Sequence, residues 1–431
     1  MDSEHQNSEW INTTIESIAI KLAMGPFGSD IKSSNFVEKG VPIIRGGNLV
    51  GGKFHEDNFV YLTEEKADSL KNSNAFPRDI VFTHRGTLGQ VGIIPKKSKY
   101  PRYVVSQSQM KLTCDPKRAD PKFVYYYFLS PIGQNELLSN TSTTGVPAIS
   151  RPLSSLKKVK ISLPPLKMQK QIVSVLSSLD DKIEINTRMN KVFEETARAL
   201  FHRWFVEFEF PDEKGRPYKS SGGKMVESEM GSVPEGWRVG KIGDVVKILG
   251  GSTPSTKNSY YWENGKNPFC TPKDLSTLNS TMLLETERHI TDEGVQNISS
   301  KQLPIGTLLL SSRAPVGYLA ISSVPVSVNQ GFIALVCDEK ISNIYLLQWL
   351  HENMEIIKGR ANGSTFQEIS KKNFRTIPFL IPTSEILNCF NLIANPIYTK
   401  IESLTKEMNN LSLFRDSLLP KLMNGEIKIE Y

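Results

Sequence analysis

Cysteine is scarce in this sequence, whose 431 residues include four thiols: Cys114, Cys270, Cys337 and Cys389. No two of them stand in a CxxC pair, so the spacing of zinc ligands is missing and no disulfide framework is suggested. Sparse cysteine is typical of proteins in a reducing compartment. We therefore expect a cytoplasmic protein without a metal site of its own.

Long apolar runs are also missing. The sequence has no apolar stretch of about 18 residues, the length that a membrane-spanning helix needs. Its first residues, MDSEHQNSEWINTT, contain no basic segment followed by an apolar one, so we expect no signal peptide. Hydrophobic residues make up 39% and charged residues 23%, an ordinary globular balance. Because a domain typically has roughly 150 residues, a chain of this length is expected to form two or three domains, each with its own core.

Recognisable catalytic motifs are absent as well. The six histidines form neither HxxxH nor HExxH, and no Ser-His-Asp arrangement stands out. Residues 47–53 fit GxxxxGK, but Phe54 stands where a phosphate-binding loop needs Ser or Thr. NPFC at 267–270 resembles the Asn-Pro-Pro-aromatic motif of amino-methyltransferases without its second proline. These absences favour a binding protein over an enzyme.

The charge balance is mildly basic. Lys and Arg number 52 against 45 Asp and Glu, which gives a formal net charge of +7. This balance permits a polyanionic partner such as DNA but does not establish one, because many basic proteins never bind nucleic acid.

The most informative feature that is present is an internal repeat. Ser-Glu-Trp at 8–10 matches Glu-Gly-Trp at 235–237, and DIVFTHRGTLGQVGII from residue 79 resembles GTLLLSSRAPVGYLAI from residue 306. The matches continue in the same order, pairing Arg85 with Arg313, Gln107 with Gln330, Cys114 with Cys337, Ile149 with Ile369 and Pro164 with Pro382. A repeat of this length indicates a duplicated domain together with the segment that follows it.

Each copy has the same internal order. Short apolar runs such as 80–82, 91–94 and 308–310 predict strands, and a helical pattern follows Pro164 and Pro382. We therefore predict an α+β protein with two similar mixed α/β domains, residues 1–165 and 233–383. Long helices are expected over 166–208 and 384–425. A linker rich in charge, Gly and Ser is expected over 209–232, and a tail over 426–431.

The two predicted helices carry the same seam, whose positions alternate in steps of four and three residues as in a coiled coil. At 1.5 Å per residue, each helix would be roughly 50 Å long. We predict that they pack antiparallel as a spacer with pseudo-two-fold symmetry. The alternative is that each helix packs on its own domain alone. The apolar seam residues are Ile172, Leu176, Leu179, Ile183, Phe193, Leu200, Ile397, Ile401, Leu404, Met408, Leu411 and Leu418, and the polar interruptions are Asn186, Asn190 and Arg415.

The junctions between domains and helices carry a resemblance to a known family. LPPL at 163–166 with Gln169, LDDKIE at 179–184 followed by LFHRWF at 200–205, and LFRDSLLPKL at 413–422 with GEI at 425–427 are the matching segments. They are similar to the DNA-specificity (S) subunits of type I restriction–modification enzymes, the HsdS family. Met168 stands where the family often has an acidic residue. The second entry, IPTSE at 381–385, lacks the double proline and the Gln, which leaves the start of the second helix open.

The resemblance implies a non-catalytic reader of DNA sequence that binds no cofactor itself. Its two domains would be target-recognition domains for the halves of a gapped, bipartite double-stranded DNA target. Two modification subunits would bind the helical region and carry S-adenosylmethionine for adenine-N6 methylation. Restriction subunits would add translocation and cleavage with ATP and magnesium. The helical faces with Lys182, Arg188, Arg198, Arg203, Lys400 and Lys406 are candidates for contacts with these partners, with ordinary solvated charge as the alternative.

Side chains that read bases must match the donors and acceptors at groove edges, and they usually lie on loops of a rigid scaffold. The candidates are Arg45, Asn48, Lys53, Arg85 and Gln107 in the first copy and Lys273, Arg313, Asn329 and Gln330 in the second. Arg85/Arg313 and Gln107/Gln330 occur in both copies, so phosphate-binding or structural roles are open for them. Two other functions also stay open: a stand-alone DNA methyltransferase with a diverged catalytic site, and a coiled-coil scaffold that does not bind DNA.

Overall fold

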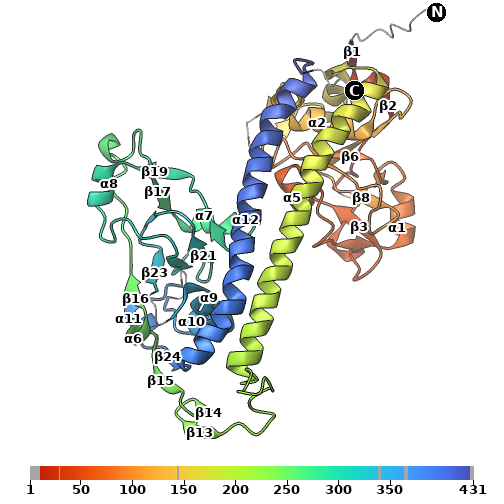
Figure 1. The fold of residues 1–431 in the computed structure, drawn as a ribbon. Coiled ribbons are helices and arrows are strands. Elements are labelled where there is room, and N and C mark those ends of the chain that lie inside the picture. Colours follow the sequence, from red (N-terminus) through yellow and green to blue (C-terminus); the bar gives the residue numbers. More distant parts are fainter. Residues whose placement is uncertain (1–9, 29, 143–144, 338–340, 364–366, 428–431) are drawn as a thin grey trace, which may run out of the picture. The chain divides into compact units, whose positions relative to one another are not determined.

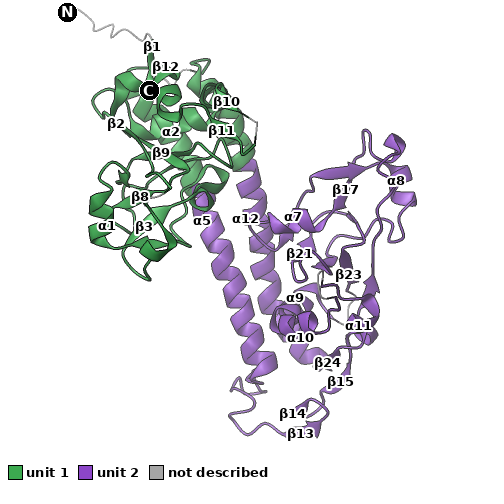
Figure 2. Cartoon of the chain, turned by 180° about the vertical axis from the view of Figure 1, so that it is seen from behind, with its two compact units in different colours: residues 1–181, 411–431 green, residues 182–410 purple. Residues whose placement is uncertain are grey.

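The structure is a computed structural model that describes residues 10–28, 30–142, 145–337, 341–363 and 367–427. The chain forms two compact units: unit 1 is residues 1–181 with 411–431, and unit 2 is residues 182–410 (Figure 2). Ser8 and Glu9 of the predicted repeat and residues 428–431 of the predicted tail lie outside the described residues. Each unit contains a mixed α/β domain and part of each long helix, α5 (Leu166–Phe201) and α12 (Ser384–Met423) (Figure 1).

The domain of unit 1 is built on two four-stranded sheets. One is antiparallel, in the order β2-β9-β6-β7, and the other has the order β4-β3-β8-β5 with β3 and β8 parallel. β6 is buried along its whole length, in keeping with its apolar residues Ile80, Val81 and Phe82. The strands are β1 (Ile11–Thr14), β2 (Ala19–Met24), β3 (Val41–Ile44), β4 (Tyr61–Leu62), β5 (Asn74–Ala75), β6 (Ile80–Thr83), β7 (Val91–Ile93), β8 (Tyr103–Val105), β9 (Gln109–Cys114), β10 (Thr141–Ser142), β11 (Ala148–Ile149) and β12 (Lys160–Leu163).

α2 (Pro121–Leu129) is the central helix of this domain. Asp120 caps it by accepting hydrogen bonds from the backbone of Lys122 and Phe123, and Pro121 suits its first turn. The helix is apolar around most of its circumference because it packs on the sheet through Phe128 and reaches α5 through Tyr126. The shorter helices of the unit are α1 (Glu64–Ser69), α3 (Pro131–Leu138) and α4 (Pro152–Lys158), with 3-10 turns η1 (Ile15–Ile18), η2 (Ser33–Asn35) and η3 (Gly46–Gly52).

Unit 2 repeats this plan. Its sheet β16-β23-β20-β21-β18 corresponds to β2-β9-β6-β7 with one strand added, and β19-β17-β22 corresponds to β4-β3-β8, again with the last two strands parallel. The strands are β15 (Arg238–Lys241), β16 (Lys247–Leu249), β17 (Asn267–Cys270), β18 (Met282–Leu283), β19 (Arg288–Ile290), β20 (Leu308–Ser311), β21 (Leu319–Ser322), β22 (Ser327–Val328), β23 (Phe332–Val336) and β24 (Pro378–Ile381). The helices are α6 (Ile242–Val245), α7 (Pro272–Ser276), α8 (Asp292–Gln296), α9 (Asn343–Glu352), α10 (Met354–Gly359) and α11 (Lys371–Arg375), with the 3-10 turn η5 (Ser259–Tyr261).

Matching backbone hydrogen bonds show that the two domains are copies of one another. His84 N donates to Ser108 O at 2.9 Å, and Ser312 N donates to Gly331 O at 2.8 Å. The next bond in each copy runs from Ile149 N to His84 O (2.9 Å) and from Ile369 N to Ser312 O (3.0 Å). The first strand of each copy also pairs with the last, β1 with β12 and β15 with β24. The predicted duplication is confirmed.

Part of the expected linker, residues 209–232, is folded into unit 2. Phe210 is buried and stacks on Trp237 with ring centroids 5.4 Å apart. A hairpin follows, formed by β13 (Met225–Ser228) and β14 (Gly231–Pro234). α5 ends at Phe201, and a π turn, η4 (His202–Val206), follows it directly. The helical segment therefore ends before residue 208, the expected end. The charged, Gly and Ser residues of this segment indicate a flexible linker. Burial of the apolar side chain of Phe210 instead holds part of it against unit 2.

Within unit 2, the two long helices run antiparallel. Residue numbers rise along α5 while they fall along α12 at successive contacts. These contacts join Asn186 Nδ2 to Glu407 Oε2 (2.8 Å), Asn190 Nδ2 to Thr405 Oγ1 (3.1 Å) and the ring of Phe201 to that of Phe390 (6.2 Å between centroids). The predicted antiparallel pair is therefore confirmed, and α5 does not pack on its own domain alone.

Within unit 1, the start of α5 and the end of α12 share a core with the domain. Ile172 and Leu176 of α5 lie in one apolar cluster with Leu419 and Leu422 of α12. Of the twelve apolar seam positions, the buried ones are Ile172, Leu176, Ile183, Ile401, Leu404 and Met408, and the half-buried ones are Leu179, Phe193, Leu200, Ile397, Leu411 and Leu418. Among the helices of the described ranges, none is both long and apolar enough to cross a membrane.

Candidate nucleic-acid interface

Three candidate side chains of unit 1 lie just beyond the ends of strands from its two sheets. Arg45 follows β3, Gln107 comes shortly after β8, and Arg85 comes shortly after β6. β3 and β8 are parallel, with Ile44 opposite Val105, so their carboxyl ends meet at one edge of the sheet. The bond from His84 N to Ser108 O holds the segment with Arg85 against the segment with Gln107.

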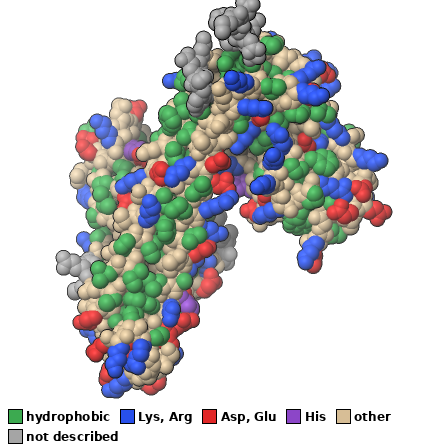
Figure 3. Space-filling view, turned by 45° about the vertical axis from the view of Figure 1, so that its right-hand side comes forward, with side chains coloured by type: hydrophobic (Ala, Val, Ile, Leu, Met, Phe, Trp, Pro, Cys, Tyr) green, Lys and Arg blue, Asp and Glu red, His purple; other side chains and the backbone are tan. Residues whose placement is uncertain are grey.

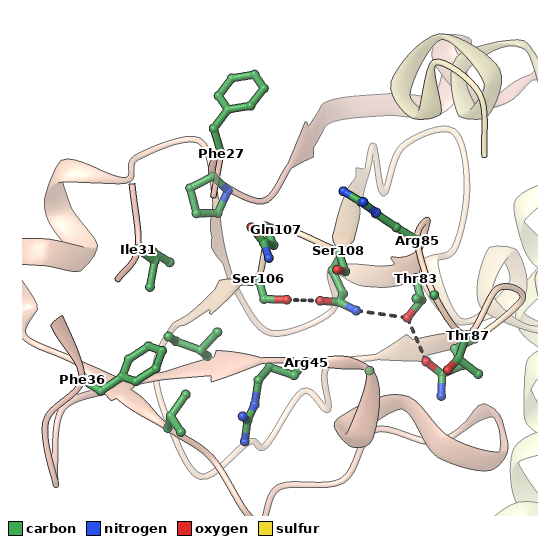
Figure 4. Close-up of a pocket in the computed structure, with 17 residues that line it drawn as sticks. Phe27, Ile31, Phe36, Arg45, Thr83, Arg85, Thr87, Ser106, Gln107 and Ser108 are labelled. Atoms are coloured by element: carbon green, nitrogen blue, oxygen red, sulfur yellow. Dashed lines mark hydrogen bonds between the residues drawn. The ribbon is translucent and has the colours of Figure 1, made fainter. Parts of the chain in front are cut away.

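These three side chains line one cavity with a volume of about 430 Å³ (Figure 4). One part of its lining is apolar and comes from Pro26, Phe27, Ile31, Phe36, Ile43 and Val60. The other part is polar and includes Thr83, Thr87, Gln90, Ser106, Ser108 and Gln109. Polar groups beside an apolar wall suit a ligand whose edge carries hydrogen-bonding groups next to a methyl group or ring face, such as a nucleobase.

A hydrogen-bonded network fixes the polar floor of this cavity. Ser106 Oγ donates to Gln109 Oε1, Gln109 Nε2 donates to Thr83 Oγ1 at 3.2 Å, and Thr83 Oγ1 donates to Gln90 Oε1 at 2.9 Å (Figure 4). Gln109 and Thr83 are buried, so their polar atoms need these partners. The network makes the floor a preformed surface on which the exposed side chains of Arg45, Arg85 and Gln107 stand.

Neighbouring groups restrain the three candidates. Arg45 Nη2 donates to Asn58 O at 3.1 Å, which directs the guanidinium along the cavity edge. A ring nitrogen of His84, Nε2, lies 3.1 Å from Gln107 O. Burial lowers the pKa of His84 below its usual 6.5, with the positive charge of Arg85 as a smaller cause. His84 is therefore largely neutral at pH 7, and its protonated Nε2 can donate to Gln107 O.

Asn48 has a structural role, contrary to our expectation that it faces DNA. It is 3% exposed, its Oδ1 accepts from Arg45 N at 3.0 Å, and its Nδ2 donates to His55 O at 3.2 Å and Asp57 O at 2.8 Å. In unit 2, Asp274 makes the corresponding bond, with Oδ2 accepting from Thr271 N at 2.8 Å. Asn48 thus fixes the backbone that presents Arg45, and both N–H groups of its amide are used within the domain.

The remaining candidate of unit 1, Lys53, is exposed but does not line the cavity. It follows the turn η3, and its backbone N–H bonds to Val50 O at 3.2 Å. An exposed lysine beside such a site suits a phosphate more than a base edge. Its ammonium group is carried on a flexible chain and lacks the planar, rigid set of donors that an arginine offers.

The four candidates of unit 2 occupy the matching strand ends. Lys273 lies on α7 directly after β17, Asn329 and Gln330 directly follow β22, and Arg313 comes shortly after β20. β17 and β22 are parallel, with Cys270 opposite Val328. As β3 and β8 bring Arg45 and Gln107 to one sheet edge in unit 1, β17 and β22 bring Lys273, Asn329 and Gln330 to one edge in unit 2. The bond from Ser312 N to Gly331 O holds the segment with Arg313 against this edge.

Their individual contacts differ from those in unit 1. Lys273 pairs with Glu287 at 2.7 Å, and this bond raises the pKa of Lys273. Arg313 lies 3.8 Å from Glu368. Asn329 Oδ1 accepts from Gly331 N at 2.9 Å, and Gln330 Oε1 accepts from Thr253 Oγ1 at 2.7 Å. Asn329 therefore helps to shape its turn, whereas the two cations are paired with exposed carboxylates that an anionic ligand can displace.

Sequence reasoning missed several side chains of these surfaces. Phe27 and Phe36 line the cavity of unit 1, and Arg288 of unit 2 stacks on Trp262 with the guanidinium carbon 3.7 Å from the ring centre. Arginine stacked on an aromatic ring is pre-organised to present its remaining donors. Phe27 stands in the turn-forming sequence Gly-Pro-Phe-Gly, which was the one available signal for an aromatic on a loop.

The surface charges are mixed. On the face shown in Figure 3, Lys and Arg are interspersed with Asp and Glu, and apolar side chains reach the surface among them. Across the described ranges, no group of three or more His, Cys, Asp or Glu is placed to hold a metal ion. The described residues of the face in Figure 3 therefore form no surface of a single charge sign.

Comparison with known proteins agrees with this geometry. The model of the "Type I restriction modification DNA specificity domain" family matches residues 7–195 and 234–409. The MjaIX specificity subunit of a type I restriction enzyme from Methanocaldococcus jannaschii is 37% identical over 161 residues, a stretch that spans 37% of each chain. The HindI specificity subunit from Haemophilus influenzae is 24% identical over 379 residues, covering 75% of this chain and 81% of that one.

A solved structure shares the fold of the whole chain. The type I restriction–modification S subunit from M. genitalium is 17% identical, with a TM-score of 0.56 over 100% of this chain and 99% of that one. The two family-model matches coincide with the two copies that carry the strand-end surfaces. The chain therefore belongs to the type I restriction–modification DNA specificity family.

Proposed function

We propose that this chain is the DNA-recognition subunit of a type I restriction–modification complex and binds a gapped, bipartite target. In this proposal, residues 1–165 read one half and residues 233–383 read the other. The observation that carries the proposal is that equivalent strand ends in both copies present cationic and amide side chains, Arg45, Arg85 and Gln107 in one and Lys273, Arg313 and Gln330 in the other. Two copies of one reading surface suit two half-sites.

The helix pair would set the spacing between the halves of the target. α5 has 36 residues and α12 has 40. At 1.5 Å per residue, each is longer than about 50 Å, which exceeds one DNA turn of about 34–36 Å. Two packed helices resist bending more than a single helix does, so the gap between the half-sites would be fixed in length.

The partners in this proposal are two modification subunits, which supply S-adenosylmethionine and adenine-N6 transfer, and restriction subunits, which use ATP and magnesium. Several helix cations that we considered for partner contact already have partners here: Lys182 lies 3.4 Å from Glu407, and Lys406 lies 2.7 Å from Glu402. Exposed apolar side chains on the helices offer further contact area, and they are Ile185, Val192, Leu392, Ile393, Leu413 and Phe414.

The test is a methylome comparison. Cells would express the modification subunit encoded beside this chain, with and without the chain itself. We expect N6-methyladenine in a two-part gapped motif only when the chain is present. Replacing residues 1–150 by the same segment of another specificity subunit should change one half of the motif and leave the other half and the gap intact.

Two results would overturn the proposal. The first is an unchanged methylome although the chain and the modification subunit co-purify, which would point to a scaffold. The second is DNA methylation by the purified chain alone, which would point to a stand-alone methyltransferase. Loss of both halves of the motif after the 1–150 exchange would contradict the assignment of one half to each domain.

A further inference from the structure

Phe27 presents an aromatic ring to solvent from a restrained turn. Its side chain is 83% exposed, the highest value among the large apolar side chains of the described ranges, whereas the preceding Pro26 is buried. Phe27 N donates to Asp30 Oδ2 at 3.1 Å, and Asp30 N donates to Phe27 O at 2.9 Å. These two bonds hold the backbone of Phe27, and the ring is displayed to solvent although nothing in the core requires it.

The ring stands at the rim of the cavity that Arg45, Arg85 and Gln107 line, and it points away from the polar floor (Figure 4). The turn lies directly against Gln107, because a Cβ added at Gly28 would come within 2.8 Å of Gln107 Oε1. An apolar ring therefore projects beside the hydrogen-bonding groups that face the proposed DNA.

The second copy carries a different side chain at the corresponding place. Ala23 pairs with Lys111 in unit 1, and Leu249 pairs with Ala334 in unit 2. Phe27 lies four residues after Ala23, and Thr253 lies four residues after Leu249, so Phe27 and Thr253 occupy corresponding positions. Thr253 Oγ1 donates to Gln330 Oε1 at 2.7 Å, and Gln330 is the counterpart of Gln107, so the loop meets the same neighbour in both copies.

This difference bears on discrimination between the two halves of a target. A side chain present in both copies, such as Gln107 with Gln330, cannot by itself make the two halves differ. A position that carries an aromatic ring in one copy and a hydroxyl in the other can do so. In the major groove, the apolar group that a base pair offers is the 5-methyl group of thymine, and Phe is among the side chains that contact it.

We propose that Phe27 is a specificity-determining residue that contacts a thymine 5-methyl group in the half-site bound by unit 1. This inference rests on the proposed DNA-recognition function and deepens it. Arg45 and Gln107 would take the polar edge of the same or the adjacent base pair. Unit 2, with Thr253 at this place, would make no corresponding aromatic contact.

The test uses the complex of this chain with its modification subunits and duplexes that contain the motif found by the methylome. Each thymine of the half-site read by unit 1 is replaced in turn by deoxyuridine, which lacks only the methyl group. At one position, the wild-type complex should bind the deoxyuridine duplex about fourfold more weakly, the equivalent of one buried methyl group. The Phe27→Ala complex should bind the two duplexes at that position equally well.

Ile20→Ala is the matched control. Ile20 is also an exposed apolar residue of unit 1, 64% exposed on β2, but it does not line the cavity, so this variant should discriminate as the wild type does. The inference is overturned if Phe27→Ala keeps the wild-type discrimination, if it weakens all duplexes alike, or if the wild type never distinguishes thymine from deoxyuridine. Absence of any motif-dependent binding by the wild-type complex would instead overturn the proposed function itself.

Discussion

The hydroxyl of Tyr126 on α2 donates a 2.6 Å hydrogen bond to Asp180 Oδ2 on α5. Unit 2 has a counterpart in which Gln348 Nε2 on α9 donates to the hydroxyl of Tyr398 on α12, also at 2.6 Å. Each domain is thus attached through its central helix to the long helix that follows it. In unit 1 the acceptor is charged, and Arg415 Nη1 donates to its other oxygen at 2.9 Å. The two attachments occupy matching places but use different chemistry.

Tyr126→Phe should loosen the attachment of the domain in unit 1 without changing its fold. A hydrogen bond to a charged, partly buried carboxylate contributes about 1.5–3 kcal/mol. Hydrogen–deuterium exchange should therefore quicken at the amides of α2 by about tenfold or more, and the amides of α9 should keep their protection. The matched variant Tyr398→Phe should do the reverse. Equal protection of α2 in wild type and Tyr126→Phe would show that packing alone holds this junction.

A buried ion pair in unit 1 gives a second prediction. Lys111 Nζ lies 2.7 Å from Asp79 Oδ2, with side chains 1% and 3% exposed, and Thr113 Oγ1 donates to Asp79 Oδ1 at 2.6 Å. Lys111→Met should lower the stability of unit 1 by about 3–5 kcal/mol, because it leaves a carboxylate buried without its partner. The measurement is thermal unfolding with hydrogen exchange at β6 and β9 as the readout for unit 1.

Two further variants test the cause of that loss. The double variant Asp79→Asn with Lys111→Met should recover most of the stability, since it removes both charges and keeps an acceptor for Thr113. Lys157→Met breaks the exposed pair with Glu16, which is 2.9 Å long, and should cost at most about 1 kcal/mol. If the double variant were as unstable as Lys111→Met, lost packing rather than an unpaired charge would be responsible.

The sequence predicted the parts of this molecule that depend on periodicity. The duplication, the two domains and the antiparallel helices with Asn186 and Asn190 in their seam follow from residue spacing. Spacing can be seen in a single amino-acid sequence. Asn48 was placed wrongly, because an amide in a polar turn reads the same whether it caps a backbone or faces a ligand. The Asp79–Lys111 pair and the Tyr126–Asp180 bond join residues far apart in the sequence, so no local pattern marks them.

His351 gives unit 2 a pH dependence. Burial, with a smaller contribution from the charge of Arg198, lowers the pKa of His351 from its usual 6.5 to about 4. Because the folded-state pKa is lower, the unfolded chain takes up a proton as the pH falls from about 6.5 towards 4, and the folded chain does not. The stabilising effect of neutral His351 is therefore complete above pH 6.5 and is lost as the pH falls through this window, by as much as about 2 kcal/mol.

The measurement is urea unfolding at pH 7 and pH 5 for the wild type and His351→Gln. Glutamine can still accept the hydrogen bond that Arg198 Nη2 offers to His351 Nδ1, 3.4 Å away, but it does not titrate. The variant should lose less stability than the wild type between the two pH values. Carboxylates that titrate in the same range affect both proteins alike, so identical losses would rule out His351 as the cause.

Arg85 and Arg45 should have separable effects on DNA binding. Arg85 has a counterpart in Arg313, so we expect it to contact phosphate in a way that does not depend on sequence. Arg85→Ala should weaken binding of the assembled complex to all duplexes, reduce the slope of log affinity against log salt by about one, and leave the methylated motif unchanged. Arg45, whose counterpart is Thr271, should act on sequence instead. Arg45→Ala should relax the motif at one base pair of one half and cost about 1–3 kcal/mol there.

The neighbours of the paired arginines allow a stricter comparison. The backbone of Arg85 bridges to Ala148, whereas that of Arg313 bridges to Glu368, whose carboxylate lies 3.8 Å from the guanidinium. A carboxylate beside Arg313 repels phosphate, so Glu368→Ala should strengthen binding of the complex to DNA, most clearly at low salt. Ala148→Glu should weaken binding in the same way through unit 1. If Arg85→Ala altered the motif and left the salt slope unchanged, Arg85 would contact a base rather than a phosphate.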